Sequence, residues 1–178
     1  MNPHELLDFW YSARIRACWF ASTPALDEEI RQRFEGHWRQ AALGALDGWQ
    51  ATPEGALALA IALDQLPLNM YRGLAASFAT LDQAIAVANG AIALGHDRAL
   101  GKERVLFLYM PLMHSEYLDD QERSVELFRA AGLDPRYPEH HRDIVRRFGR
   151  FPHRNAPLGR ASSAAELDYL ASADAFKG

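Results

Sequence analysis

The fold is decided by the stretch TPEGALALAIALDQLP, residues 52–67. Thr52 and Pro53 are typical of a helix start, because threonine caps free backbone N–H groups and proline needs no N–H partner in the first turn. The residues that follow are apolar on nearly every side of a helix. We therefore predict a buried central helix over Glu54–Gln65. Pro67 should end it, because a proline disfavours helical backbone in the residue before it.

Similar signals predict seven more helices around this one. Apolar residues recur at three- and four-residue steps. Thr80 with Gln83 is predicted to cap one of these helices, and Ser163 with Glu166 is predicted to form a capping box for the last one. The predicted helices lie at 2–11, 24–45, 80–95, from about 102 onward with Pro111 kinking or ending it, 120–131, 138–148 and 163–173. No segment alternates well enough for a strand, so we predict an all-α fold of about eight helices in antiparallel hairpins.

The spacing of the helices also predicts how they pack. Two of them open 38 residues apart, at residues 81 and 119, and each ends in glycine. This spacing is near the period of about 34 residues in tetratricopeptide arrays, although the full repeat signature is absent. The prediction is a tetratricopeptide-like bundle of stacked hairpins without a regular array.

The composition is that of an ordinary globular protein. The chain has 178 residues, 49% of them hydrophobic and 24% charged, so we expect residues 1–178 to form one domain with a substantial core. Cys18 is the only cysteine, which excludes an internal disulfide. No signal peptide is visible and the longest apolar runs are too short to span a membrane. We therefore expect a cytoplasmic protein without membrane contact.

A basic segment late in the chain is the first candidate for a binding site. Residues 142–160 contain six arginines and one aspartate, whereas the whole chain has a net charge of -4. Either the guanidinium groups tie down backbone carbonyls of a proline-broken loop, or they bind a carboxylate or phosphate. An ion pair with Asp143, four residues earlier on the same helix, could satisfy Arg147 instead. The anion-binding candidates are Arg72, Arg147, Arg150, Arg154 and Arg160.

Two other segments carry groups suited to acid–base chemistry. His114 and Glu116 follow a helical proline, and Asp64 ends the central helix. Imidazole titrates near neutral pH, so if the protein is an enzyme, His114 or His153 is the predicted proton shuttle. Its partner would be Asp64 or Glu116, since burial raises the pKa of a carboxyl group. The alternative is that these groups satisfy backbone atoms where helices break. The supporting candidates are Gln65, Asn69, Tyr71, Tyr109, Ser115 and Asn155.

Other site chemistries find little support in the sequence. His114-Ser115-Glu116 lacks the flanking glycines of a nucleophile elbow, which disfavours a Ser-His-acid triad. No His-x-x-x-His or Glu-x-x-His pair puts two ligands on one helix face, and the arginines would repel a cation, so neither a metal nor a cofactor is expected. Arginine and phenylalanine are interleaved in residues 147–154, but no other basic stripe extends them, so nucleic acid is not an expected partner.

Four blocks of the sequence resemble one bacterial family. They are Trp19-Phe20, Leu63–Gly73 (LDQLPLNMYRG), Tyr109–Glu116 (YMPLMHSE), and Arg147–Asn155 (RFGRFPHRN) with Gly159-Arg160. In this order, and over nearly the whole chain, they are similar to the family catalogued as domain of unknown function 924. The resemblance implies a single helical domain with tetratricopeptide-like packing, and it implies no activity. Leu68 departs from the family, which tends to have a basic residue there. If that residue helps to hold an anion, this chain holds it with one charge fewer.

These observations lead to two functional hypotheses of different classes. In the first, the last three blocks form a polar cleft that binds a small anionic metabolite, with acid–base catalysis if the protein is an enzyme. In the second, stacked hairpins bind a protein or peptide on a concave surface without catalysis. A third reading is that the blocks are purely structural. Convergence of Asp64, Arg72, His114, Glu116 and residues 147–160 in space distinguishes a site from a set of local contacts.

Overall fold

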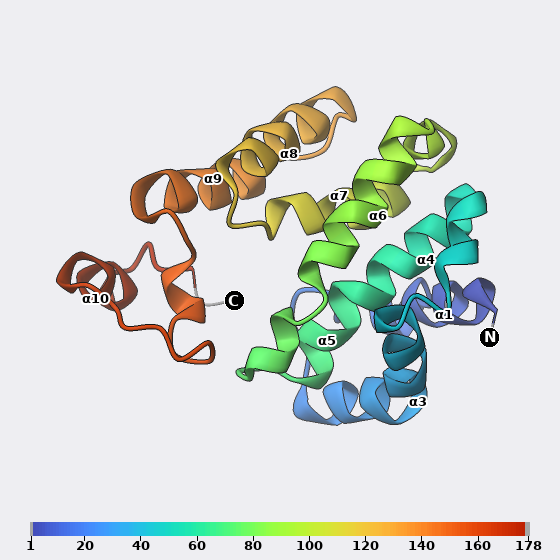
Figure 1. The fold of residues 1–178 in the computed structure, drawn as a ribbon, viewed down its shortest axis with the longest axis horizontal. Helices are drawn as coiled ribbons and strands as arrows, with labels where there is room; N and C mark the ends of the chain where they lie inside the picture. The colour runs from blue at the N-terminus through green and yellow to red at the C-terminus, as the bar shows by residue number, and fades with distance from the viewer. Residues whose placement is uncertain (1, 177–178) are drawn as a thin grey trace.

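A computed structural model describes residues 2–176, which form ten α-helices, four short 3-10 helices and no strand (Figure 1). The α-helices are α1 (Pro3–Trp10), α2 (Ala13–Arg16), α3 (Pro24–Ala42), α4 (Pro53–Leu63), α5 (Gln65–Met70), α6 (Leu81–Ala93), α7 (Lys102–Met113), α8 (Leu118–Ala130), α9 (Arg136–Phe148) and α10 (Ala164–Ala171). The 3-10 helices are η1 (Asp47–Ala51), η2 (Ala75–Phe78), η3 (His96–Ala99) and η4 (Pro152–Arg154). The predicted all-α class is confirmed.

Helix α4 is the centre of the fold, as its sequence predicts. Every residue from 56 to 63 is at most 2% exposed. Helices α1, α3, α6 and α7 pack around it. The side chain of Thr52 accepts the N–H of Gly55, so the predicted threonine cap is present. An all-round apolar helix is stable here because neighbours cover it on each side.

The predicted end of the central helix is wrong. Helix α4 ends at Leu63, and α5 begins two residues later instead of the chain leaving helical structure before Pro67. Pro67 is the third residue of α5, where a backbone N–H would have no helical acceptor, so the proline is tolerated. The break falls at Asp64, whose backbone N–H still bonds to the carbonyl of Ala60. Asp64 therefore projects from a junction between two helices.

Tertiary packing decides how two other local signals act. Pro111, predicted to kink or end its helix, lies inside α7, which ends two residues later at Met113 between α4, α6 and α8, and the kink stays a prediction. The predicted cap at Thr80 is wrong. Thr80 does not cap α6, because its hydroxyl donates to the carbonyl of Leu63 at 2.6 Å and accepts the indole N–H of Trp38 at 3.0 Å. The hydroxyl of Thr80, which the sequence predicts to cap α6, thus satisfies the buried carbonyl of Leu63 at the end of α4.

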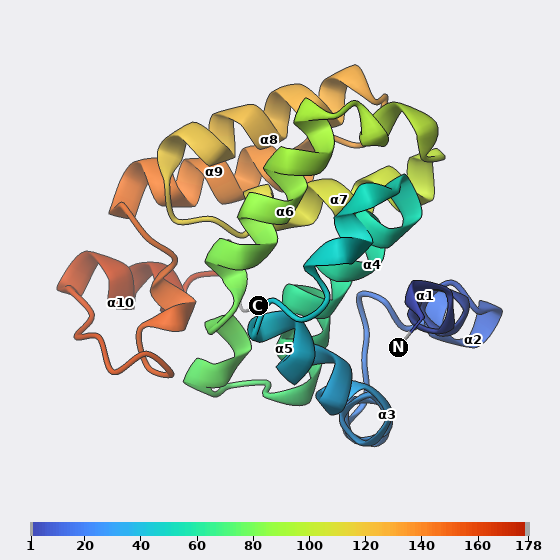
Figure 2. The same ribbon diagram turned by 45° about the vertical axis from the view of Figure 1, so that its right-hand side comes forward.

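The C-terminal part of the described chain has a small apolar core of its own. This C-terminal core consists of Ile144, Val145, Phe151 and Tyr169, and it is separate from the large core around α4. Figure 2 shows α8 and α9 side by side above α10, apart from α4 and α5. Ser163 and Glu166 form the predicted capping box of α10. The tetratricopeptide-like arrangement stays a prediction.

Some large apolar side chains are exposed on the surface. Among residues 2–176 the large exposed apolar side chains belong to many different elements: Phe20, Leu43, Leu74, Leu94, Tyr117, Leu118, Tyr137, Leu158 and Leu167. None of the helices in this range is both long and apolar enough to cross a membrane. Peptide binding on a concave surface stays a prediction.

Candidate functional site

Asp64 and His114 form the acid–histidine pair of the site. The Nδ1 atom of His114, at the end of α7, lies 2.8 Å and 3.0 Å from the two carboxylate oxygens of Asp64. Asp64 is 3% exposed and also accepts the side-chain amide of Gln65 at 2.6 Å. A carboxylate at Nδ1 favours the tautomer with its proton there, which leaves Nε2 as the reactive nitrogen. His114 Nε2 has no hydrogen-bond partner among residues 2–176.

Glu116 joins the end of α7 to the basic segment. Its oxygens accept both terminal guanidinium nitrogens of Arg160, at 2.7 Å and 2.9 Å, and the backbone N–H of Phe151 at 2.8 Å. Burial opposes ionisation of Glu116, but these hydrogen bonds outweigh it and lower the pKa of the carboxyl group. Glu116 is therefore an ionised, fully engaged acceptor, and Asp64 is the residue that pairs with the histidine.

Glu166 is the acid that the sequence reasoning missed. It receives a two-pronged contact from Arg150, at 2.7 Å and 2.9 Å, and the amide of Asn155 at 3.3 Å. Arg150 is the main reason why the pKa of Glu166 is lowered. The sequence assigned Glu166 only to a helix cap. Its nearness to Arg150, sixteen residues away, depends on the loop between α9 and α10.

Arg154 has no such carboxylate partner. Its side chain is 5% exposed, and its guanidinium carbon lies 4.7 Å from the ring centre of Phe78 and 4.5 Å from that of Phe151. Within the described residues no carboxylate approaches it within 4.0 Å, and its Nε donor is buried without an acceptor. Burial lowers the pKa of Arg154 to about 10, opposed by the fields of Glu116 and Asp64. The group is charged at neutral pH and its donors are unused.

A buried histidine, His141, and a half-buried one, His153, also lie near Phe151. The ring centres of His141 and His153 are 5.5 Å and 5.6 Å from that of Phe151, and the ring of His141 is 6.3 Å from that of His114. Burial lowers the pKa of both imidazoles to about 3, so both are neutral at physiological pH. His153 is thus poorly matched to proton transfer at neutral pH.

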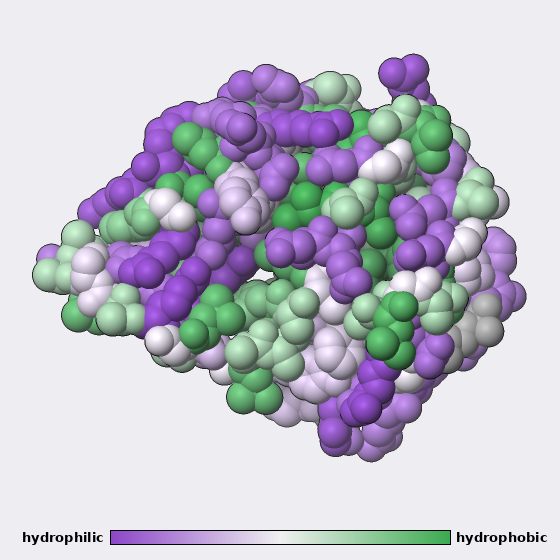
Figure 3. Space-filling model, in the orientation of Figure 1, coloured by the Kyte–Doolittle hydropathy of each residue, from purple (hydrophilic) through white to green (hydrophobic). Residues whose placement is uncertain are grey.

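The structure therefore brings together part of the predicted site. We call the converging residues the polar cluster: Asp64, His114, Glu116, His141, His153, Arg154 and Arg160. Figure 3 shows a hollow between the C-terminal segment and the central helices, with hydrophilic side chains on the C-terminal side. In residues 2–176 no three histidine, cysteine, aspartate or glutamate side chains are grouped so as to hold a metal ion.

Several predicted residues make local contacts instead. Arg72 pairs with Asp27 of α3 at 2.9 Å and also contacts Asn69. The hydroxyl of Tyr71 donates to Glu35, that of Tyr109 donates to Asp97, and that of Ser115 donates to Asp120. Each of these groups already has a partner that accounts for its presence without a ligand.

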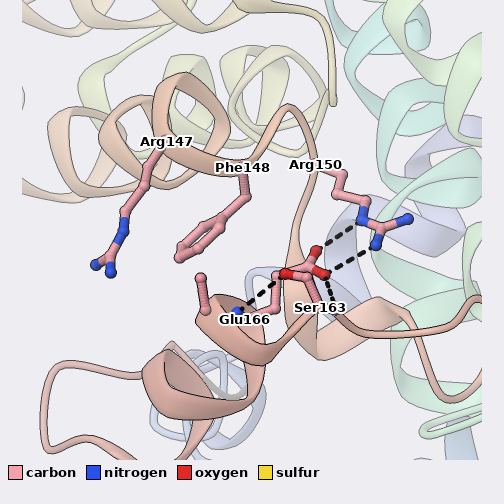
Figure 4. A pocket seen from close by; sticks show the side chains of 6 residues that line it. Arg147, Phe148, Arg150, Ser163 and Glu166 are labelled. Carbon is pink, nitrogen blue, oxygen red and sulfur yellow. Dashed lines mark hydrogen bonds and ion pairs between the residues drawn. The ribbon is translucent and has the colours of Figure 1, made fainter.

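Arg147 and Arg150 line a separate, open pocket of about 460 Å³ (Figure 4). Arg150 points to Glu166, while Arg147 lies over the ring of Phe148 at 4.6 Å and points away from that ion pair. The predicted pair of Arg147 with Asp143 does not form, because Asp143 contacts Arg142 and Arg146 instead. Arg147 is thus exposed and belongs to this pocket and not to the polar cluster.

Comparison with known proteins gives a consistent result. The profile of the family described as "Bacterial protein of unknown function (DUF924)" matches residues 6–174. The solved structure of a protein of unknown function from Agrobacterium tumefaciens, ATU0120, is similar over 95% of this chain and 96% of that chain, with 39% sequence identity and a TM-score of 0.90. No curated protein matches the chain.

Proposed function

The chain belongs to the DUF924 family of bacterial proteins, and we propose that its polar cluster binds a small anionic metabolite, bearing a phosphate or a carboxylate, at Arg154. The observation that carries this proposal is the state of Arg154, which is 5% exposed with no carboxylate within reach among the described residues. A buried guanidinium without an acceptor is costly, and an anion supplies the acceptors.

The neighbouring arginines provide the contrast that supports this choice. Arg150 and Arg160 each bind a carboxylate through two nitrogens: Arg150 ties its loop to α10, and Arg160 ties the same loop to the segment between α7 and α8. These two arginines therefore hold the loop in place, which is the structural alternative for the basic segment. Arg154 lies in the same segment, but the nearby carboxylates of Asp64 and Glu116 are already occupied by other donors. Its planar fork is the one suited to a bidentate ligand.

The pair formed by Asp64 and His114 supports acid–base chemistry on the bound anion. Asp64 fixes the ring through Nδ1, and Nε2 is then the atom that takes or gives a proton. His114 is the proton shuttle in this proposal because His141 and His153 are held neutral by burial. The two arginines and two carboxylates of the cluster cancel in formal charge, so an incoming anion meets no net negative charge there.

Thermal unfolding in inorganic phosphate, at constant ionic strength, tests the proposal. The wild type should be stabilised as phosphate rises, by about 1.4 kcal/mol at ten times the dissociation constant. Arg154→Met should remove this dependence. Arg147→Met is the matched control, since it deletes the same charge from the same segment at an exposed position without a carboxylate partner, and it should leave the dependence intact.

Two results would refute anion binding at Arg154. One is an Arg154→Met protein that melts earlier but keeps the phosphate dependence, which would make Arg154 a structural group between two phenylalanine rings. The other is a wild type that shows no shift with phosphate or acetate. Isothermal titration with phosphate gives a direct check, and Arg154→Lys, which keeps the charge and loses the fork, should bind more weakly than the wild type.

A further inference from the structure

His141 has a buried nitrogen that nothing in the described chain satisfies. Its Nδ1 atom lies 2.8 Å from the backbone carbonyl of Tyr137, one helical turn earlier on α9. A carbonyl only accepts hydrogen bonds, so the proton of this imidazole is on Nδ1. Nε2 is then a hydrogen-bond acceptor, and it is buried without a partner in a side chain that is 4% exposed.

The direction of this acceptor follows from the helix. Nε2 lies at the far end of the ring from the bond to Tyr137, so it faces away from the backbone of α9. The His141 ring packs on Phe151, as Arg154 does, and its other neighbour in the polar cluster is His114. A donor group at Arg154 and an acceptor at His141, both without a partner in the described residues, therefore lie near the same phenylalanine ring.

We propose that His141 Nε2 accepts a hydrogen bond from a hydroxyl group of the ligand, so that the ligand is a hydroxylated anion, either a phosphorylated alcohol or a hydroxycarboxylate. This inference rests on the proposed function, because it places the anionic group of the ligand at Arg154. A bare anion leaves the acceptor empty, whereas a ligand with a hydroxyl group beside its charge fills both subsites.

The surroundings of His141 support an acceptor role. Because burial lowers the pKa of the ring to about 3, the lone pair on Nε2 is available throughout the physiological range. A neutral His114 cannot donate a hydrogen bond to His141 as well as to Asp64, since its single N–H is directed to Asp64. No hydrogen bond joins His141 to His114 or His153.

The ring of Phe176 packs against this part of the cluster. Its ring centre lies 4.4 Å from that of His141 and 5.1 Å from that of His153, and its backbone N–H donates to the hydroxyl of Tyr169 at 2.9 Å. This ring adds to the burial of the imidazole. A buried acceptor gains most from a ligand that supplies a hydrogen-bond donor.

Two matched pairs of probes test the inference by isothermal titration calorimetry. In each pair the anionic groups are the same and only the hydroxyl groups differ: glycerol 3-phosphate against propyl phosphate, and malate against succinate. The wild type should bind the hydroxylated member of at least one pair about tenfold more tightly, which is the factor that one ordinary hydrogen bond supplies.

Variants then assign the preference to one atom. His141→Phe keeps an aromatic ring and removes the acceptor, so the affinities within the preferred pair should become equal while the weaker binder keeps its affinity. His141→Gln places an amide oxygen near the position of Nε2 and should keep part of the preference. His140→Phe is the matched control on an exposed neighbouring histidine and should behave as the wild type.

The possible failures are distinguishable. If the wild type binds inorganic phosphate but does not discriminate within either pair, the hydroxyl subsite is wrong and anion binding at Arg154 stands. If His141→Phe keeps the full preference for the hydroxylated probe, a residue other than His141 binds the hydroxyl group and the inference is wrong. If the wild type does not bind inorganic phosphate, acetate or any of the four probes, the proposed function is wrong and this inference is wrong with it.

Discussion

Replacing Glu116 with glutamine should lower the free energy of unfolding by about 2 kcal/mol. The carboxylate accepts two hydrogen bonds from Arg160 and one from the backbone of Phe151, and so holds the basic segment against the end of α7. Glutamine keeps the shape and one acceptor oxygen. It loses the negative charge, and its NH₂ group must face either the guanidinium or a backbone N–H.

The magnitude follows from the exposure of the two partners. Breaking a fully buried ion pair costs about 3 to 5 kcal/mol, whereas an exposed pair contributes about 0 to 1 kcal/mol. The side chains of Glu116 and Arg160 are 26% and 25% exposed, so water partly compensates for the lost partner. The expected loss therefore lies between the two limits, at about 2 kcal/mol.

Urea unfolding followed by circular dichroism measures this loss. A double-mutant cycle with Arg160→Met should give a coupling of about 1 to 2 kcal/mol. The control is Glu28→Gln, which breaks an ion pair with Arg31 whose side chains are 44% and 46% exposed, and which should leave stability unchanged. If the Glu116 and Glu28 variants are equally stable, the contact at Glu116 contributes nothing and the reasoning from burial is wrong.

The same pair predicts a pH dependence of defined sign. The pKa of Glu116 is lowered in the folded protein, so its contribution is present above the ordinary carboxyl pKa and disappears as the pH falls through the lowered value. The stability difference between the wild type and Glu116→Gln should therefore be full at neutral pH and vanish in acid. A difference that persists in acid would assign the loss to shape and not to charge.

Three further predictions concern the core and its histidines. Gly55→Ala should destabilise the protein by about 1 to 3 kcal/mol, because the added Cβ would collide with the backbone oxygen of Trp49. An unchanged melting temperature in differential scanning calorimetry would contradict this. Thr80→Val should cost about 1 to 3 kcal/mol in urea unfolding, since it leaves the carbonyl of Leu63 without its donor. Burial lowers the pKa of His141 to about 3, so as the pH falls below about 6.5 the unfolded chain takes up a proton there and the folded chain does not. This group alone should therefore reduce the free energy of unfolding by about 1.4 kcal/mol for each pH unit. His141→Phe should show a smaller pH dependence of unfolding, and an unchanged pH dependence would contradict the lowered pKa.

The helical class and the central helix were predictable because both depend on local signals. Threonine and proline mark the start of α4, and its apolar residues require cover on every side. The behaviour of Pro67 and Thr80 was not predictable, because each depends on a partner distant in sequence. Thr80 caps nothing because a carbonyl seventeen residues earlier takes its hydroxyl. Pro67 breaks nothing because a new helix begins just before it.

The candidate site was predictable by residue type but not by pairing. The sequence indicates that arginines, histidines and acids gather in a few blocks, and it gives no means of matching them. Glu166 is read as a cap because its local pattern is complete without Arg150. Arg154 differs from Arg150 and Arg160 in two ways. Its guanidinium lies over two phenylalanine rings, and the nearby carboxylates already accept hydrogen bonds from other donors. Three-dimensional neighbours decide which arginine is left for a ligand.

The separate C-terminal core has a consequence for how the protein opens. Phe151 belongs to that core, and it is joined to α7 through the polar contacts of Glu116 and Arg160. Apolar packing within α4 and its neighbours resists salt, whereas such ionic contacts weaken with screening and acid. Amide hydrogens of η4 and α10 should therefore exchange with solvent through a low-energy local opening that high ionic strength promotes, while those of α4 exchange only on global unfolding. Since Arg154 lies in η4, each such opening would also take the anion site apart.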